Sequence, residues 1–498
     1  MNDVENTAML DCLLVCPNYK LNKGSVYRSQ RFNDPPLGLM ALASYVREKG
    51  HSVKIVDCNV EARGVENFTN HLKKNYVDKN ISIRVFGFTT TTLTISTAFL
   101  MAKVCKVLYP ESTVVFGGTH STLMSEESIN NENVDIVAKG EGELTLEEIL
   151  AGKEWSEIDG IVYKNNLEKD KIVSAKPRER IKNIDILPFP AYDLIEISRY
   201  RPVTGAYKRL PAMLMVSSRG CPWSCIFCKG AFEQRATFRS AERIYEEVLH
   251  LVNNCGIKEI LFMDDVFTVK KKNLAKLCDL LIENKIDITW VCFARVDVID
   301  LELLQKMKDA GCHQIMYGVE NFDPEVLKTI NKKISKDLVF QAVRWTKEIG
   351  IDVRLSFLVG NPGDTEEIIL ENIRLIRELD PAILVVCIVM PFPGTALYTW
   401  AKSNDRIITY DWDEYYGANP VMRIDHLSTR DINRLYAKMI RSFYFRPHYI
   451  LRKILKSHTW TEIGMLAIGF TGLVAFSIER AKRNAKGYTF AKLVSQFW

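Results

Sequence analysis

Three cysteines stand close together near the middle of the chain, at Cys221, Cys225 and Cys228. The apolar residues 211–216 before them are typical of a buried strand, and the glycine and proline that follow break regular structure. The sequence therefore predicts that the three thiols share one loop at a strand end. Cysteine thiolates hold iron–sulfur clusters. A four-iron cluster takes four ligands and this loop supplies three, which leaves one iron open to a ligand that is not protein.

Two other kinds of site use clustered cysteines. A structural zinc site would need a fourth cysteine or histidine close by, and the next downstream candidates, His250 and Cys255, lie across a predicted helix. A disulfide framework needs paired cysteines in an oxidising compartment. The remaining cysteines are mostly isolated, which is typical of small buried side chains in a reducing cytosol. The spacing therefore favours an iron–sulfur cluster.

The composition is that of a folded chain. Hydrophobic residues make up 47% of the 498 residues. The length suggests about three domains, and the hydrophobic content allows sizeable cores. The first ten residues are polar and acidic and lack an apolar stretch, so the sequence predicts no secretory signal and a cytoplasmic location.

Positive charge is concentrated at the C-terminal end. The formal net charge is +5, yet residues 441–498 alone contain ten Lys and Arg against two Asp and Glu. The rest of the chain therefore carries a small negative charge. Because the chain is not basic in general, we expect no nucleic-acid partner.

The first 150 residues alternate short apolar runs with amphipathic segments. The pattern predicts strands at residues 11–16, 53–57, 83–88, 114–116 and 134–138, with helices at 36–49 and 95–108 and from 144 onwards. Such alternation with short connections is typical of a doubly wound, Rossmann-like parallel sheet in an α/β fold. Ligands bind such sheets outside the carboxyl ends of the strands.

Glycine- and threonine-rich turns follow three of these predicted strands. Glycine lets the backbone approach a ligand closely, and threonine hydroxyls donate hydrogen bonds without bulk. Glycine pairs after a strand are also ordinary turn chemistry. The residues that would meet a ligand there are Thr89, Thr90, Gly117, Gly118, Thr119, His120, Gly140, Glu141 and Gly142.

A second series of β/α units begins at the strand before the cysteine loop. Predicted strands lie at residues 212–216, 257–263, 288–293, 313–319, 352–359 and 383–390, with helices at 241–254, 274–284, 338–349 and 366–379. Six units predict a partial (β/α)6 barrel, and the chemistry of barrels lies at the carboxyl ends of their strands. Those ends carry Asp264, Asp265, Arg295, Glu320, Gly360 and Pro391.

Several of these residues have a structural alternative. Asp264 and Asp265 could cap the next helix. Gly360 and Pro391 stand in stretches that form good turns whether or not they bind anything.

The cysteine loop, with Phe227 directly before its third cysteine, resembles the signature of the radical S-adenosylmethionine (SAM) enzymes. With the turns at residues 35–39, 117–120 and 140–143, nearly the whole chain resembles the cobalamin-binding members of that family. The resemblance implies a [4Fe–4S] cluster on the three cysteines and cobalamin on the glycine- and threonine-rich turns. It implies SAM beside Phe227, Asp264, Arg295, Glu320, Gly360 and Pro391.

The resemblance also implies a reaction. In the family, an adenosyl radical made from SAM takes hydrogen from an unactivated carbon, and methylcobalamin then gives that carbon its methyl group. Some relatives oxidise or cyclise a ring instead. A chain with these sites could also carry electrons or a corrinoid without catalysis of its own. The implied partners are a small-molecule or lipid substrate and an electron donor such as flavodoxin or ferredoxin.

One motif of other cobalamin domains is missing. The chain has no D-x-H-x-x-G segment to supply a lower axial histidine. We therefore expect cobalamin with its base displaced and no histidine of that motif on cobalt. His120 is expected as a turn histidine, beside the corrin or solvated, rather than as a cobalt ligand.

We expect four regions. Residues 1–165 form a cobalamin-binding domain, residues 166–205 a linker, residues 206–400 the radical SAM core, and residues 401–498 a mainly helical region. The aromatic stretch around Trp412, Tyr415 and Tyr416 could cover the barrel mouth or form a small core of its own.

An uncharged run of sixteen residues, 463–478, lies within the basic C-terminal region. It is shorter than a usual spanning helix. Three interpretations stay open: a helix packed on the catalytic domain, an interfacial anchor at an anionic membrane surface, which would be a peripheral contact, and a truncated span.

Overall fold

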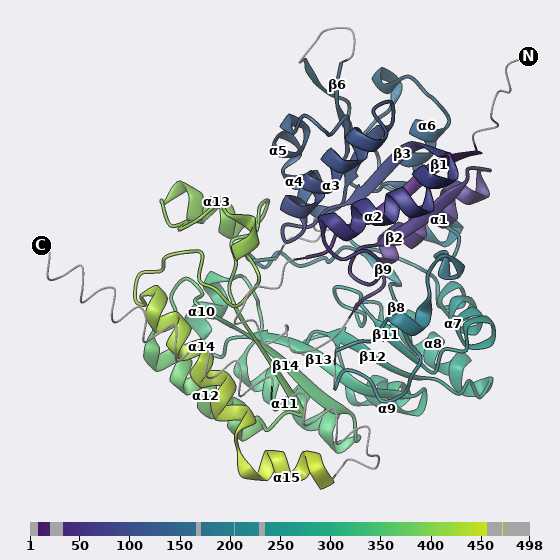
Figure 1. Cartoon of the computed structure of the whole chain (residues 1–498). Coiled ribbons are helices and arrows are strands. Elements are labelled where there is room, and N and C mark those ends of the chain that lie inside the picture. Colours follow the sequence, from purple (N-terminus) through teal and green to yellow (C-terminus); the bar gives the residue numbers. More distant parts are fainter. Residues whose placement is uncertain are drawn as a thin grey trace, which may run out of the picture.

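The computed structural model describes residues 8–19, 33–165, 171–203, 205–228 and 235–455, together with Thr471. Two β-sheets organise these residues, and helices cover the sheets (Figure 1). The first sheet is drawn in purple and blue, and the second, in teal and green, lies beside it. The expected α/β architecture is confirmed.

The first sheet has seven strands in the order β2-β1-β3-β4-β5-β6-β7. Strands β1 to β5 are parallel, and β6 and β7 add an antiparallel edge. The strands are β1 (Ala8–Cys16), β2 (Val53–Asp57), β3 (Ile81–Thr89), β4 (Thr113–Gly117), β5 (Ile136–Ala138), β6 (Ile161–Lys164) and β7 (Ile172–Ser174). The five predicted parallel strands are therefore confirmed.

Helices lie on both faces of this sheet, as a doubly wound sheet requires. They are α1 (Leu37–Glu48), α2 (Val65–Asn75), α3 (Ile95–Leu108), α4 (Thr119–Leu123), α5 (Ser125–Asn130) and α6 (Glu143–Leu150). Helices α4 and α6 start at the turns after β4 and β5, so the glycine-rich turns stand at helix N-termini.

The second sheet is a six-stranded, all-parallel half-barrel in the order β15-β14-β13-β12-β11-β8. Its strands are β8 (Ala212–Met215), β11 (Glu259–Phe262), β12 (Thr289–Ala294), β13 (Cys312–Glu320), β14 (Asp352–Val359) and β15 (Ile383–Ile388). Its helices are α7 (Ala241–Cys255), α8 (Lys271–Glu283), α9 (Leu301–Asp309), α10 (Pro324–Thr329), α11 (Lys336–Glu348) and α12 (Glu366–Leu379). The predicted (β/α)6 arrangement is confirmed.

Local sequence signals start the barrel helices. The side chains of Ser240, Asp300, Ser335 and Thr365 each accept a hydrogen bond from the backbone N–H three residues later. These contacts satisfy donors that the first helical turn leaves free. These four helices therefore have sharply defined starts, which help to fix the loops that precede them.

The segment between the sheets is only partly irregular. Residues 166–205, the predicted linker, contain β7 at the edge of the first sheet. They also contain three short 3-10 turns at Ile184–Ile186, Tyr192–Leu194 and Ile197–Arg199. The predicted linker thus shares one strand with the first sheet, and the domain boundaries stay a prediction.

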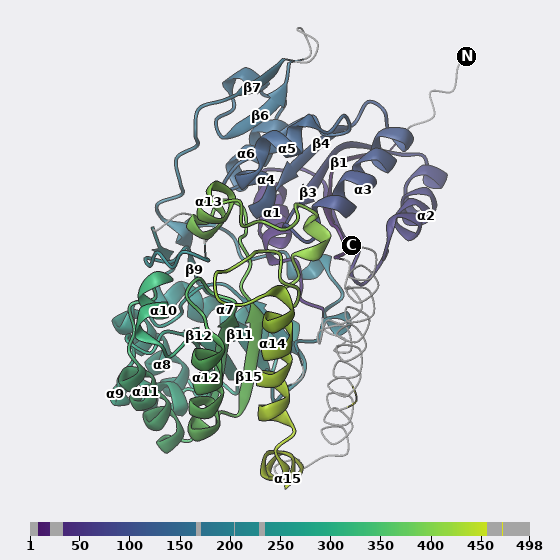
Figure 2. The same cartoon turned by 90° about the vertical axis from the view of Figure 1, so that its left-hand side faces the viewer.

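The C-terminal region contains α13 (Ala396–Ser403), a 3-10 turn at Trp412–Glu414, α14 (Thr429–Tyr444) and α15 (Pro447–Leu455). Helix α14 packs beside β15 and α12 at the open edge of the half-barrel (Figure 2). Trp412, Tyr415 and Tyr416 are buried, so these aromatic side chains form core rather than an exposed cover.

No helix in the described part of the chain is long and apolar enough to cross a membrane. The uncharged run 463–478 lies outside the described residues, apart from Thr471.

Candidate active site

Two cavities lie where the carboxyl ends of the two sheets face each other. The first, here called the barrel cavity, has a volume of about 800 Å³ and is bordered by Cys221, Cys225, Cys228 and the barrel strand ends. The second, the interdomain cavity, has a volume of about 550 Å³ and is bordered by the first sheet, the 184–192 segment and the start of the cysteine loop. Asp265 borders both, so the two spaces adjoin.

The cysteine loop is fixed from the barrel side. The N–H of Ile226 donates to the carbonyl of Ile330 at 3.1 Å, and the carbonyl of Ile226 accepts from the N–H of Leu397 at 2.9 Å. The Asn331 amide also donates to the Ser224 carbonyl and hydroxyl. The loop backbone is thereby held between two barrel loops, while its three thiols form no disulfide.

The thiol donors fit a cluster better than a single ion. In the described residues, no three His, Cys, Asp or Glu side chains are close enough together to hold one metal ion. A four-iron cluster does not need that convergence, because each thiolate binds its own iron. Burial raises the pKa of Cys228 to about 12, with Asp265 and the other two thiols adding to the shift. Iron binding would relieve this penalty, since a coordinating thiol is deprotonated outright.

Arg295, predicted to hold a carboxylate of SAM, borders the barrel cavity with its guanidinium already engaged. It donates to both oxygens of Asp297, at 2.9 and 2.8 Å, and to the Lys332 carbonyl. The same group lies 4.4 Å from the ring centre of Trp223 in the cysteine loop. The structure thus gives Arg295 a bracing contact with that loop, and contact with SAM stays a prediction.

Glu320 reaches the barrel cavity through an irregularity in its strand. The pairing of β13 with β14 shifts register between Gly318 and Glu320, and Glu320 has a φ of 69°. Its carboxylate accepts from Lys332 Nζ at 3.2 Å and faces the Ser356 hydroxyl at 3.4 Å. A Cβ at Gly318 would stand 2.6 Å from the Glu320 carboxylate, so a larger residue there would displace the Glu320 side chain. Lys332 and Ser356 border the same cavity and were not predicted.

Asp264 and Asp265 have different surroundings. The Asp264 carboxylate is buried and accepts from the Ser217 N–H at 3.0 Å and from the Ser217 and Ser218 hydroxyls. Burial raises its pKa to about 6. Asp264 borders only the interdomain cavity, whereas Asp265 borders both cavities. Neither aspartate caps α8, whose N-cap residue is Lys270, so the helix-cap alternative is wrong.

Phe227 borders the barrel cavity as predicted for a residue near SAM, but Gly360 and Pro391 border neither cavity. The Gly360 N–H donates to the buried carboxylate of Asp364 at 2.9 Å, which organises the turn after β14. The turn alternative therefore describes Gly360 better than ligand contact does.

Most of the residues predicted for cobalamin gather at the interdomain cavity. They are Thr89, Gly117, Gly118, Thr119, Gly140, Glu141 and Gly142. A Cβ built on Gly38 or Gly140, which both border this cavity, would meet no protein atom within 4 Å. The cavity is therefore open beside these two glycines. Gly118 has a different reason to be glycine, because its Cβ would stand 2.6 Å from the Thr90 carbonyl.

Thr90 and His120 do not border this cavity. The Thr90 hydroxyl donates to the Gly117 carbonyl at 2.8 Å and braces the turn. His120 is buried, and Trp412 lies edge-on to it with ring centres 5.4 Å apart. Glu127 lies 3.4 Å from its Nε2 and accepts a hydrogen bond from the Trp412 indole. The expectation of a solvated histidine is wrong, because His120 is buried and packs against the C-terminal region; a position beside the corrin stays a prediction.

An ion-pair cluster joins the two sheets at the interdomain cavity. Arg219, which precedes the cysteines, pairs with Glu141 at 2.9 Å and with Glu143. Glu141 also accepts from the N–H of Ile181 at 2.6 Å. All three charged side chains border the cavity and are mostly buried. Sequence reasoning missed this cluster, because Arg219 and the two glutamates lie 76 or more positions apart.

Two family models match the chain. The B12 binding domain model matches residues 28–150, and the radical SAM superfamily model matches residues 215–376. The first span contains the turns at the interdomain cavity, and the second contains the cysteine loop and most of the half-barrel.

Curated relatives match over most of their length. An uncharacterised methyltransferase of Pyrococcus horikoshii is 33% identical over 90% of this chain and 96% of its own. An anaerobic magnesium-protoporphyrin IX monomethyl ester cyclase of Rubrivivax gelatinosus is 23% identical over 88% and 78%. The hopanoid C-3 methylase of Methylococcus capsulatus is 26% identical over 76% and 70%.

Solved structures share the fold. The radical SAM methyltransferase TsrM of Kitasatospora setae, solved with cobalamin and a [4Fe–4S] cluster, superposes with a TM-score of 0.67 at 15% identity. The match covers 94% of this chain and 99% of that chain. The cobalamin-dependent radical SAM enzyme OxsB gives 0.69 at 17% identity, over 94% and 72%.

The architecture and the two cavities agree with these matches, and a relative at 33% identity spans nearly the whole chain. The chain therefore belongs to the cobalamin-binding radical SAM enzymes.

Proposed function

We propose that this enzyme methylates a carbon of a small-molecule substrate, with SAM and a [4Fe–4S] cluster in the barrel cavity and cobalamin in the interdomain cavity. When bound, the cluster and cobalamin supply reductive SAM cleavage and methyl transfer. The observation that supports this best is that the two cavities adjoin at Asp265. A substrate carbon placed there would be reachable from both sides, and a reaction between bound groups depends on such placement.

Different residues of the barrel cavity would bind different parts of SAM. Glu320 offers a carboxylate to ribose hydroxyls, and its ion pair with Lys332 fixes its position. Phe227 supplies an apolar face beside the cysteines, and Asp265 supplies a carboxylate for an amino group. The hydrogen bonds of Asp264 to Ser217 and Ser218 hold the strand end from which the cysteine loop departs.

The interdomain cavity would hold cobalamin without a protein ligand to cobalt from histidine. None of the described residues that border it is a histidine, and His120 is turned into the contact with Trp412. The absorption spectrum of bound cobalamin tests this, since histidine coordination in the wild-type protein would contradict it.

Similarity to ring-forming cyclases supports a second candidate, in which the same cofactors oxidise or cyclise the substrate. Isotope labelling separates the two. A deletion strain, and the same strain with the gene restored, are fed methionine labelled in its methyl group. Their metabolites and lipids are then compared by mass spectrometry. A compound that appears only with the gene and carries the labelled methyl supports methylation. A gene-dependent compound without label supports cyclisation or oxidation.

We further propose that the enzyme works in the cytoplasm and takes electrons from a flavodoxin- or ferredoxin-like donor. The basic C-terminal region would hold it at an anionic membrane surface, which would suit an apolar substrate. Exposed Leu451, Ile454 and Leu455 on α15 stand beside Arg452 and Lys453 and support this part of the proposal. Basic groups near such a surface gain on the order of 1 kcal/mol each.

A further inference from the structure

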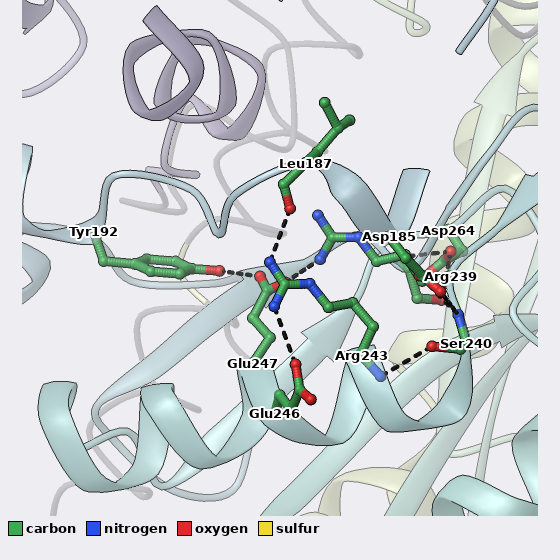
Figure 3. Close-up of polar contacts among 10 residues, drawn as sticks. Asp185, Leu187, Tyr192, Arg239, Ser240, Arg243, Glu246, Glu247 and Asp264 are labelled. Atoms are coloured by element: carbon green, nitrogen blue, oxygen red, sulfur yellow. Dashed lines mark hydrogen bonds and ion pairs between the residues drawn. The ribbon is translucent and has the colours of Figure 1, made fainter. Parts of the chain in front are cut away.

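A buried arginine from the barrel side borders the interdomain cavity. Arg239 is 8% exposed and stands just before α7, across the cavity from the glycine-rich turns. One Nη of its guanidinium donates to Glu247, which is 1% exposed. The Tyr192 hydroxyl donates to the other oxygen of Glu247 at 2.6 Å. Figure 3 shows the side chains of Arg239 and Tyr192 meeting at the Glu247 carboxylate.

The backbone around Arg239 is held as firmly as its side chain. Its N–H donates to the Ser217 carbonyl at 2.9 Å, and its carbonyl accepts from the Asn273 amide at 3.0 Å. With Glu247 fixing one end of the guanidinium, the group is preorganised, and little conformational entropy remains to be lost when a ligand binds.

The other Nη has no partner. Among the described residues, Glu247 is the only group to which the Arg239 guanidinium donates, and Figure 3 shows its second Nη without a dashed contact. A guanidinium carries five N–H donors. Because Arg239 lines the cavity, this remaining donor suits a ligand with an oxygen acceptor inside the cavity.

The charged groups around the cavity indicate whether the oxygen acceptor of the ligand is anionic or neutral. Its wall carries four carboxyl groups, of Glu141, Glu143, Asp264 and Asp265, against two guanidinium groups, of Arg219 and Arg239. Both guanidinium groups are already paired with glutamates. An anion would meet a net negative wall, whereas a neutral carbonyl oxygen would accept a hydrogen bond without repulsion. Cobalamin carries neutral carboxamides around the rim of its corrin ring.

We propose that Arg239 donates a hydrogen bond to a carboxamide oxygen at the corrin rim. Cobalamin would then be bound by a residue of the barrel side as well as by the first sheet. This inference rests on the proposed binding of cobalamin in this cavity. It makes Arg239 a cofactor-binding residue and Glu247 and Tyr192 the groups that position it.

The same contacts also brace the protein, so the test needs a matched control. Arg243, one turn further along α7, donates to the Leu187 carbonyl at 2.9 Å and to Glu246 at 3.0 Å (Figure 3). It ties the 184–192 segment to α7 directly, whereas Arg239 is linked to that segment only through Glu247 and Tyr192, and Arg243 does not border the interdomain cavity. Loss of this bracing would weaken corrinoid binding in either variant, and loss of a corrin contact would affect Arg239 variants alone.

The experiment measures the binding of two corrinoids to the full-length protein by absorption titration. Hydroxocobalamin carries the rim carboxamides and the nucleotide tail with its phosphate, and cobinamide carries the carboxamides without the nucleotide. The variants are Arg239→Met and Arg243→Met. Arg239→Gln and Arg239→Lys, which keep some donors, stand in if Arg239→Met does not fold. Thermal melting of each apoprotein reports folding.

We expect Arg239→Met to raise the dissociation constants of both corrinoids roughly tenfold or more, as for the loss of a hydrogen bond from a charged donor. Arg243→Met should stay within about twofold of the wild type, and the Gln and Lys variants should lie between. Equal loss in the Met variants of Arg239 and Arg243 would show that Arg239 only braces the fold.

Other results also overturn the assignment. Weaker binding of cobalamin alone would place Arg239 at the nucleotide phosphate, and unchanged binding of both would leave it without a contact. A wild-type protein that binds neither corrinoid would overturn the proposed cobalamin site itself. Wild-type binding with an insensitive Arg239 would overturn only this inference.

Discussion

Arg219 of the cysteine loop donates to the carboxylate of Glu141 at 2.9 Å, which ties the thiols of the half-barrel to the glycine-rich turn of the first sheet. Only Gly220 separates Arg219 from Cys221, so the contact fixes the cysteine loop relative to the interdomain cavity. Glu143 shares the same guanidinium. The position of one proposed cofactor relative to the other thus rests on a mostly buried ion-pair cluster.

Replacing Arg219 with Met should lower the free energy of unfolding by about 3 kcal/mol, because breaking a buried ion pair leaves its carboxylates uncompensated. Arg209→Met is the control, since Arg209 also donates two hydrogen bonds to carboxylate oxygens, both on Asp287, but this pair is much more exposed. Its loss should change stability by less than about 1 kcal/mol. Urea denaturation of the apoproteins measures both, and equal losses would contradict the role of the cluster.

Asp264 should make stability depend on pH. Its pKa is raised from 3.8 to about 6 by burial, so the folded chain keeps this proton more tightly than the unfolded chain. The resulting stabilisation is present below pH 4 and is lost as pH rises through about 6, by roughly 3 kcal/mol for a shift of about two pH units. Asp264→Asn should remove this part of the pH profile in urea denaturation between pH 4 and 7. A wild-type profile that matches the variant would contradict the assignment.

Gly38 gives a direct test of the space in the interdomain cavity. It stands in α1 without a positive φ, and a Cβ there would meet no protein atom within 4 Å. Gly38→Phe should leave the apoprotein folded but weaken cobalamin binding at least tenfold, because the ring would occupy the cavity. Gly38→Ala should bind nearly as the wild type does and gain up to about 1 kcal/mol in stability, since alanine favours helix. Normal binding by the Phe variant would place cobalamin elsewhere.

The basic C-terminal region should bind anionic membranes. Full-length protein should co-sediment with liposomes containing phosphatidylglycerol, and high salt should weaken but not abolish this binding. A chain ending at Tyr444, which lacks α15 and all residues after it, should lose most of it, and neutral liposomes serve as the control. Binding that is equal for the two chains would show that residues 445–498 make no contribution.

The strands and helices with a regular pattern of apolar residues could be predicted from the sequence. The apolar runs of β1 to β5 and of the barrel strands, and the capped amphipathic helices between them, carry strong local signals. Helix α2 was missed because it has few apolar residues, with Phe68 and Leu72 as its buried anchors. Strand β7 was missed because it is short and only partly buried.

For the site, residue type and strand position together predicted most of the side chains that reach the cavities, but not how they are paired. Cys221, Glu320 and Gly140 lie where their strand ends placed them. The register shift near Gly318, the lining residue Lys332 and the Arg239–Glu247 pair depend on contacts between distant segments. The burial of His120 was not predicted for the same reason, because its neighbour Trp412 lies almost 300 positions further along the chain.

The central claim is that the three cysteines hold a cluster that cleaves SAM, and 5′-deoxyadenosine formation measures it most directly. Anaerobically reconstituted protein with SAM and a strong reductant should release 5′-deoxyadenosine, as quantified by liquid chromatography. Cys225→Ala should abolish the product together with the iron-dependent absorption, whereas Cys278→Ala, which alters a buried core thiol, should keep both. Product formation by Cys225→Ala at the wild-type rate, or none by the wild-type protein with its cluster intact, would contradict the account.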